Sequence, residues 1–147
     1  MRSFEEYFSA IGVGEPIQKR ISEILGKIKK LNLNVDFTDV SINEYLDKDG
    51  IRHFTDIRFY SNNIIVNVAD FLIEDDFYVS GACKNILTLK VQAKNYDFVQ
   101  ANESSRLRII GFLVERPVKI ELNGTGTNCD YMFDIYKKHL LPRLVLP

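Results

Sequence analysis

The spacing of hydrophobic residues divides the chain into a helical beginning, a long middle of strands and a helical end. Near the N-terminus, apolar residues recur at the spacing of one helix face: Phe4, Tyr7, Phe8 and Ile11. Ser3 and Glu6 match a capping box, in which two side chains satisfy free backbone N–H groups of the first turn. The pattern therefore predicts a short capped helix that ends at Gly12.

A second, longer helix is predicted to begin at Pro16, because proline is favoured in the first helical turn. Its apolar residues form one stripe that predicts a buried face: Ile17, Ile21, Ile24, Leu25, Ile28 and Leu31. The opposite side is polar. Gly26 lies near the centre of that exposed side, where glycine costs about 1 kcal/mol relative to alanine, and nothing in the sequence explains it.

From Asn34 to Leu122 the hydrophobic period changes to two residues, which is typical of strands. Two strand-like runs flank residues 47–50, whose Asp-Lys-Asp-Gly composition indicates a hairpin loop. The most regular alternation predicts an antiparallel strand at 86–94 with one buried face, formed by Leu87, Leu89, Val91 and Ala93. The run at 106–115 carries apolar residues on both faces, so we expect a helix or a partner chain to cover the second face.

The stretch 123–140 (NGTGTNCDYMFDIYKKHL) runs two glycines directly into a helical pattern. It lacks the lysine of a phosphate loop and the third glycine of a dinucleotide fingerprint. Thr127 and Asp130 instead match a second capping box. The prediction is a turn followed by a capped helix, which ends before Pro142.

Two helices, six or seven antiparallel strands and one last helix predict a single α+β domain over residues 1–147, with a strongly bent sheet. From about Val35 to Leu141 this order resembles the pleckstrin-homology arrangement, in which a final helix plugs one end of a bent barrel. The second choice is the helix-grip fold of apolar ligand carriers, which would have a strand before the first helix. Both resemblances concern the order of elements, which implies a fold and not a function.

The composition narrows the possible partners. With 46% hydrophobic and 27% charged residues, the chain has an ordinary globular composition. Its net charge of −1 disfavours nucleic acid as a partner, because proteins of that class usually carry a basic excess. No apolar run reaches the roughly 18 residues that span a bilayer, and the N-terminus lacks the pattern of a signal peptide. We therefore expect a cytoplasmic protein without a membrane span.

Motifs that carry catalytic or metal chemistry are not found. The cysteines and histidines lack the spacing of a zinc site and are few: Cys83, Cys129, His53 and His139. The cysteines are expected to stay reduced as small buried residues. No nucleophile motif is present either. We predict no cofactor and no metal, and we favour a non-catalytic role, although scattered carboxylates that meet in a pocket would leave no motif.

Two groups of residues are candidates for binding. Lys19, Lys27 and Lys30 give the second predicted helix a basic side, which is solvated by default but suits an acidic or phosphate-bearing surface. Leu144 and Leu146 belong to an apolar C-terminal run. Full burial of one aliphatic side chain contributes up to about 1.5–3 kcal/mol, and an exposed tail would lose this stabilisation. This tail either folds back across the sheet or docks on a partner.

Two functions agree with these features. The first is a non-catalytic interaction module that binds a protein, or a second copy of itself, through loops and one sheet edge. The second is a small-molecule binding protein or enzyme, with an apolar ligand in a pocket between the 16–31 helix and the concave sheet. A cavity of about 300 Å³ or more with a converging polar pair would favour the second, and a filled interior with an exposed apolar strip would favour the first.

Overall fold

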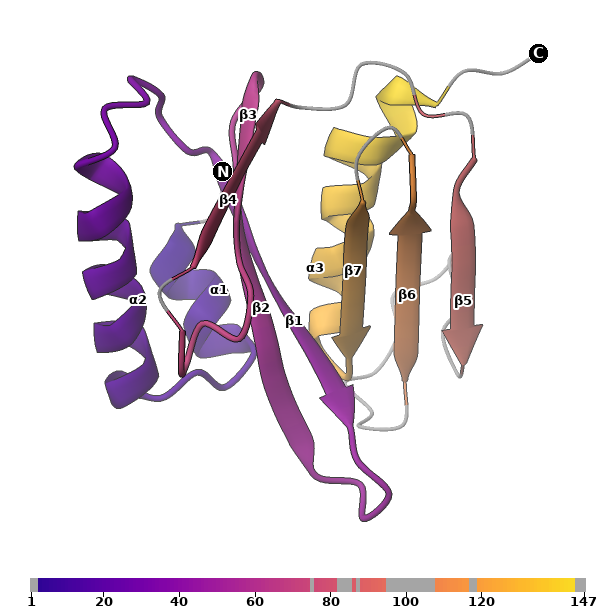
Figure 1. Cartoon of the computed structure of the whole chain (residues 1–147). Helices are drawn as coiled ribbons and strands as arrows, with labels where there is room; N and C mark the ends of the chain where they lie inside the picture. The colour runs from indigo at the N-terminus through magenta and orange to yellow at the C-terminus, as the bar shows by residue number, and fades with distance from the viewer. Residues whose placement is uncertain are drawn as a thin grey trace.

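The computed structural model describes residues 3–74, 76–81, 86, 88–94, 108–116 and 119–144. The elements follow one another in the predicted order: α1 (Phe4–Ala10), α2 (Glu15–Lys29), β1 (Asp39–Leu46), β2 (Arg52–Tyr60), β3 (Ile64–Val68), β4 (Phe77–Gly81), β5 (Lys90–Lys94), β6 (Ile109–Val114), β7 (Ile120–Thr125) and α3 (Asn128–Ile135). A π-helical turn (Tyr136–Leu140) and a 3₁₀ turn (Leu141–Arg143) continue α3. Figure 1 shows α1 and α2 beside the first four strands, and α3 behind β7 and next to β6. The α+β class is confirmed.

The described strands form two antiparallel sheets, where one bent sheet was expected. β1 to β4 pair in sequence order in a four-stranded sheet, and β5 to β7 do so in a three-stranded sheet. The edge strands β1 and β7 lie side by side and run in the same direction (Figure 1). Side chains of β1 occupy the hydrogen-bonding groups of β7, so no backbone ladder joins these two strands. The described strands therefore close no barrel.

α1 and α2 cover one face of the β1–β4 sheet. Ser3 Oγ accepts the Glu6 N–H at 3.1 Å, which confirms the Ser3 half of the capping box predicted for α1. Leu31 lies beyond the end of α2 and is 46% exposed, so its predicted place in the buried stripe is wrong. The core on this side combines α1, the α2 stripe and the inward-facing strand residues, and its members include Tyr7, Phe8, Ile11, Ile21, Ile24, Ile28, Val40, Ile42, Ile57, Phe59, Val66, Val68 and Phe71.

α3 covers one face of the β5–β7 sheet and packs against β7 and β6. The core between them is apolar, and its members include Ile110, Phe112, Val114, Ile120, Leu122, Cys129 and Met132. β5 is the outer strand, and all its residues are exposed. The predicted burial of Val91 and Ala93 is therefore wrong, while Leu89 is partly buried and Leu87 lies outside the described residues. On the second face of β6, Ile109 is 36% exposed, so this face is only partly covered.

The glycines before α3 serve close packing, as the prediction of a turn and helix requires. A Cβ at Gly124 would lie 2.9 Å from Met132 Cγ and 3.1 Å from the Asn128 carbonyl oxygen. Gly126 has φ +53°, a left-handed conformation that glycine adopts without strain. Thr127 occupies the N-cap position but makes no side-chain capping bond, so this part of the predicted capping box is wrong.

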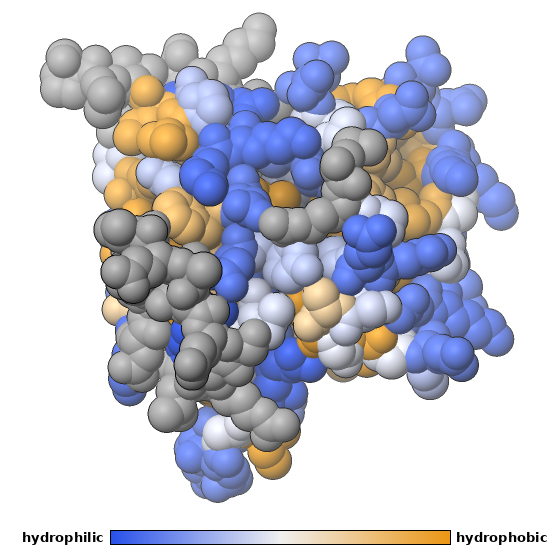
Figure 2. All heavy atoms as spheres, turned by 180° about the vertical axis from the view of Figure 1, so that it is seen from behind, coloured by the Kyte–Doolittle hydropathy of each residue, from blue (hydrophilic) through white to orange (hydrophobic). Residues whose placement is uncertain are grey.

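The surface seen from behind is mixed in polarity. Figure 2 shows hydrophobic residues in separate groups among hydrophilic ones on this face. Among the residues that the structure describes, no helix combines the length and the apolar composition needed to cross a bilayer.

Candidate functional site

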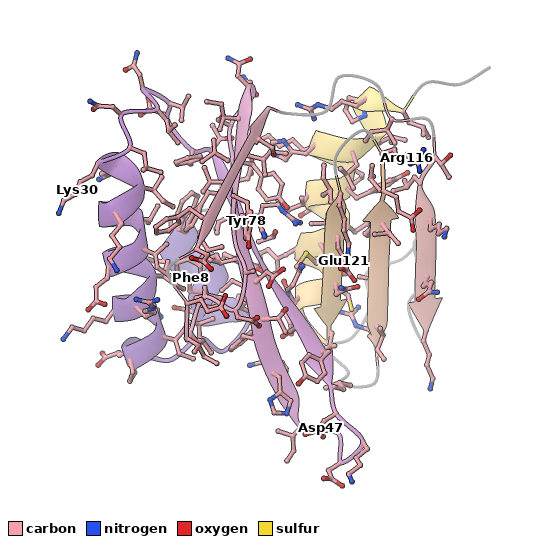
Figure 3. All side chains as sticks on the ribbon, viewed as in Figure 1. Phe8, Lys30, Asp47, Tyr78, Arg116 and Glu121 are labelled. Atoms are coloured by element: carbon pink, nitrogen blue, oxygen red, sulfur yellow. The ribbon has the colours of Figure 1, made fainter. Side chains whose placement is uncertain are left out.

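The five predicted binding residues do not form one site. Lys19, Lys27 and Lys30 are exposed on α2 and at its C-cap, and Figure 3 shows Lys30 pointing away from the molecule. Leu144 lies elsewhere and packs against the core under α3. Leu146 lies outside the described residues.

The described part of the C-terminal run folds back on the protein. The Ile86 N–H donates to the Arg143 carbonyl at 2.7 Å, and Leu144 forms an isolated parallel bridge with Ile86. Leu140 is 1% exposed within the same core. Of the two predicted arrangements of the tail, the fold-back is the one that these residues adopt.

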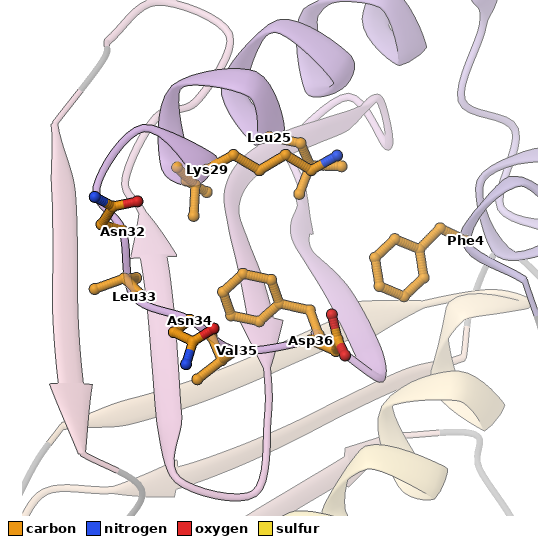
Figure 4. Close-up of a pocket in the computed structure, with 10 residues that line it drawn as sticks. Phe4, Leu25, Lys29, Asn32, Leu33, Asn34, Val35 and Asp36 are labelled. Carbon is orange, nitrogen blue, oxygen red and sulfur yellow. The ribbon is translucent and has the colours of Figure 1, made fainter.

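A cavity lies where the chain leaves α2, and we call it the α2 pocket. Its volume is about 530 Å³, and it is lined by Phe4, Leu25, Ile28, Lys29, Asn32, Leu33, Asn34, Val35, Asp36 and Phe37. Figure 4 shows these residues around the opening, with Lys29 and Asp36 on opposite sides. The pocket thus involves the helix that was predicted to border a ligand site, but the 32–37 segment forms its other wall.

Two asparagines shape the α2 pocket. Asn32 and Asn34 have φ of 56° and 52°, in the left-handed region that asparagine tolerates better than most residues. These two positions turn the segment after α2, and Leu33 and Phe37 then pack against the core under α1 and α2. Residues held in this region cost of order 1–3 kcal/mol each and are often found at ligand sites.

The lining of the α2 pocket combines apolar and polar side chains. Apolar side chains line its inner part, and the ionisable residues of its lining are Lys29 and Asp36, both exposed. Cys129, the one cysteine among the described residues, does not line this pocket, because it is buried in the core under α3. Burial raises the pKa of Cys129 to about 12, so the thiolate that a nucleophile requires is scarce at neutral pH.

A second cluster of functional groups is a polar seam between β1 and β7. The Asn43 side chain donates to the Glu121 carbonyl at 2.7 Å and accepts the Asn123 N–H at 3.1 Å. Arg58 Nη1 donates to the same Glu121 carbonyl at 2.7 Å. Figure 3 shows Glu121 on β7 at the border with the first sheet. Side chains therefore replace the backbone pairing that would join the two sheets.

Glu44 extends this seam and is fully buried. Its Oε1 accepts the Thr125 N–H at 2.8 Å and the Thr125 hydroxyl at 2.9 Å. Its Oε2 has no hydrogen-bond partner, although Arg52 Nε lies 3.4 Å away. Burial raises the pKa of Glu44, and this effect outweighs the Thr125 hydrogen bonds and the charge of Arg52, which lower it.

The seam is completed by a triad of buried groups that joins α1, β1 and α3. The Tyr7 hydroxyl donates to Asn128 Oδ1 at 2.8 Å and accepts the Ile42 N–H at 2.9 Å. Asn128 Nδ2 donates to the Ile42 carbonyl at 2.9 Å. Burial raises the pKa of Tyr7, so its phenol stays neutral and keeps this donor.

One feature of the sequence indicates the seam, although the hydrophobic period of two residues does not reveal it. Asn43 and Glu44 are adjacent and both polar, which breaks the period of two, and both are buried. The β1–β2 register shifts between Ile42 and Glu44, where a β-bulge places two residues of β2 opposite Asn43. In this strand, the pair of neighbouring polar residues coincides with the bulge and with the contacts to β7.

A third cluster ties the end of the chain to β1. His139 is 3% exposed, and its Nε2 lies 2.8 Å from Asp39 Oδ2, as does Lys138 Nζ. The His139 ring stacks on Tyr60 with 4.7 Å between ring centroids. Burial raises the pKa of Asp39, but hydrogen bonds from His139, Lys138 and Thr38 together lower it further, so the net pKa lies well below its ordinary value. Within the described residues, no group of three or more His, Cys, Asp or Glu side chains could hold a metal.

Comparison of the chain with protein-family models, with curated proteins and with solved structures finds no match. The proposals that follow therefore depend on the geometry of the chain itself.

Proposed function

We propose that the protein is a non-catalytic binding protein, and that its ligand is a small amphiphilic molecule held in the α2 pocket with an anionic end. The observation that supports this proposal is the pocket itself. Its volume of about 530 Å³ lies within the range of about 300–1,000 Å³ that small-molecule sites occupy. A cavity of this size is one of the two features expected of a ligand binder; the second, a converging polar pair, is not evident here, because Lys29 and Asp36 lie on opposite sides of the opening.

The lining indicates the chemistry of the ligand. Phe4, Leu25 and Phe37 would contact an apolar body. Burial of apolar surface contributes roughly 25 cal/mol per Å², so this part of the ligand would supply most of the affinity. Lys29 lines the pocket beside Lys30 at the end of α2, and Asp36 is the acidic residue of the lining. The lining itself carries one charge of each sign, so the proposed anionic end depends on Lys29 being the charged residue that the ligand contacts.

The test uses anilinonaphthalene sulfonate, a probe with an apolar ring system and one anionic group. Binding is followed by NMR through the side-chain amide resonances of Asn32 and Asn34, which line the pocket. We expect saturable shifts of both amides. Lys29→Gln should weaken binding by about tenfold, because a charge-assisted hydrogen bond contributes about 1.5–3 kcal/mol.

Two matched controls separate this site from general apolar adsorption. Lys19→Gln makes the same change on α2 at a residue outside the pocket lining, and it should leave the affinity within twofold, about 0.4 kcal/mol. Val35→Gln places a polar group in the lining and should weaken binding, whereas Val79→Gln on β4 should not. Equal effects of the paired variants, or no shift at Asn32 and Asn34, would contradict the proposal.

A second candidate function is protein binding along β4. This strand is the outer strand of its sheet, and Tyr78 and Val79 are 58% and 45% exposed. An exposed edge strand without lysine is a template for a further strand. Sedimentation equilibrium tests whether the protein associates with itself through this strand. The average mass of the Val79→Lys variant should be lower than that of the wild type. A wild-type protein that is monomeric at all concentrations would exclude self-association.

A further inference from the structure

A second cavity, which we call the hairpin pocket, lies between the β1–β2 hairpin and the turn before α3. Its volume is about 510 Å³, and it is lined by Leu46, Gly50, Ile51, Arg52, Thr125, Gly126 and Thr127. It shares no lining residue with the α2 pocket. Figure 3 places Asp47 at the tip of the same hairpin, beyond the body of the two sheets.

Glu44 lies behind the wall of this pocket and has one unused acceptor. Its side chain is 0% exposed, and it contacts two lining residues, Thr125 through Oε1 and Arg52 across a gap of 3.4 Å from Oε2. Oε2 is buried and accepts no hydrogen bond. A buried acceptor left without a donor costs about 1–3 kcal/mol, and more when the group is charged. A ligand that supplies an N–H to Oε2 would remove this cost.

Arg52 can admit such a ligand. Its side chain is 36% exposed, and its guanidinium lies over the Phe54 ring, 4.7 Å from the centroid. Gly12 also lies close to the guanidinium, since a Cβ at Gly12 would be 3.0 Å from Arg52 Nη2. A rotation of this partly exposed side chain toward solvent would let a ligand group enter between it and Oε2.

The charges of the pocket select a neutral ligand. Glu44 and Arg52 carry opposite charges and already compensate each other. An anion placed between them would face the buried carboxylate of Glu44, and a cation would face the guanidinium of Arg52, so either ion would meet a like charge at close range. A neutral group with a donor and an acceptor on adjacent atoms keeps the balance, because its N–H can bond Oε2 while its C=O accepts from Arg52.

We propose that the hairpin pocket is a binding site for a neutral carboxamide carried on a small apolar group. The carboxamide lies between Glu44 and Arg52, and the apolar group contacts Leu46 and Ile51, which line the pocket next to Arg52 on the hairpin. Ile51 is 57% exposed in the free protein, so a ligand here would cover apolar surface that is open to water.

Three isosteric probes test the charge selection: benzamide, benzoate and benzamidinium. Each is titrated into the wild-type protein and followed by NMR at the Arg52 Nε–H and the Thr125 amide. We expect saturable shifts with benzamide and weaker binding of the two ions. Stronger binding of either ion, or no saturable shift with benzamide, would overturn the proposal.

Two hairpin variants test the role of Arg52. Arg52→Met should weaken benzamide binding at least about tenfold, because a hydrogen bond to a charged group is lost. Lys48→Met is the matched control, since Lys48 is an exposed cation of the same hairpin outside the pocket lining, and it should leave the affinity unchanged. Equal weakening by both variants would overturn the proposal.

Glu44→Gln should reverse the preference of the site. The variant keeps an oxygen for the Thr125 bonds and turns an NH₂ group toward Arg52, so that two donors face the ligand. Benzoate should then bind more tightly than benzamide, and an unchanged order would contradict the assignment. If this variant does not fold, the ranking of the three probes and the Arg52 pair still decide the outcome.

Discussion

Replacement of Asn128 by alanine tests whether the buried triad holds the two halves of the protein together. Asn128 is 1% exposed, and its amide bonds both the Tyr7 hydroxyl and the Ile42 carbonyl. Alanine would leave these two buried groups without their partner, at about 1–3 kcal/mol each. The free energy of unfolding should therefore fall by about 2–6 kcal/mol, which is a large part of the roughly 5–15 kcal/mol of a typical domain.

Urea unfolding followed by circular dichroism measures this loss, and thermal unfolding should show a fall of about 2–4 °C per kcal/mol. Tyr7→Phe removes the hydroxyl from the same triad. The double variant should therefore lose less than the sum of the single losses, by about 1 kcal/mol or more. Strict additivity would show that the two side chains act independently.

Asn62→Ala is the matched control, because Asn62 is exposed in the turn between β2 and β3. It should change the free energy of unfolding by less than about 0.5 kcal/mol. If Asn128→Ala costs no more than this control, the reasoning about the buried triad is refuted.

Two further predictions concern stability. Gly124→Ala should destabilise the fold by about 1–3 kcal/mol, because the new Cβ meets Met132 and the Asn128 backbone at 2.9–3.2 Å. In Gly26→Ala the new Cβ meets no atom within 4 Å, so this variant should stabilise α2 by about 0.5–1 kcal/mol. If chemical denaturation gives changes of the same sign for both variants, the packing argument is wrong. The carboxylate of Asp39 has a lowered pKa, so its contribution to the free energy of unfolding is complete above the unfolded pKa of about 3.9 and is lost as the pH falls below it. Asp39→Asn should therefore be destabilising at neutral pH, and its melting temperature should converge with the wild-type value in acid. Parallel pH profiles of the two melting temperatures would exclude this linkage.

Local patterns in the sequence predict the elements that depend on near neighbours. The α2 stripe, the hairpin at 47–50 and the turn before α3 all follow from the spacing and chemistry of adjacent residues, and the structure has each of them. The fold-back of Leu144 was one of two arrangements that the sequence left open.

Features that depend on distant contacts could not be predicted in this way. The division into two sheets depends on Asn43 and Glu44 reaching residues about 80 positions away along the chain. The exposure of Val91 depends on α3 packing behind the neighbouring strands rather than behind β5. The α2 pocket requires left-handed backbone at Asn32, and periodicity carries no information about the sign of φ.

Because of the seam, the coupling of the two sheets depends on the identities of a few individual side chains. A backbone ladder forms with almost any side chains, but the bonds across β1 and β7 exist only while Asn43, Glu44 and Arg58 keep their identities. Substitutions at these three positions can therefore loosen one half against the other directly. Because Tyr60 and Ile65 of the first sheet pack in the core under α3, such a change also reaches the hydrophobic packing of the second half.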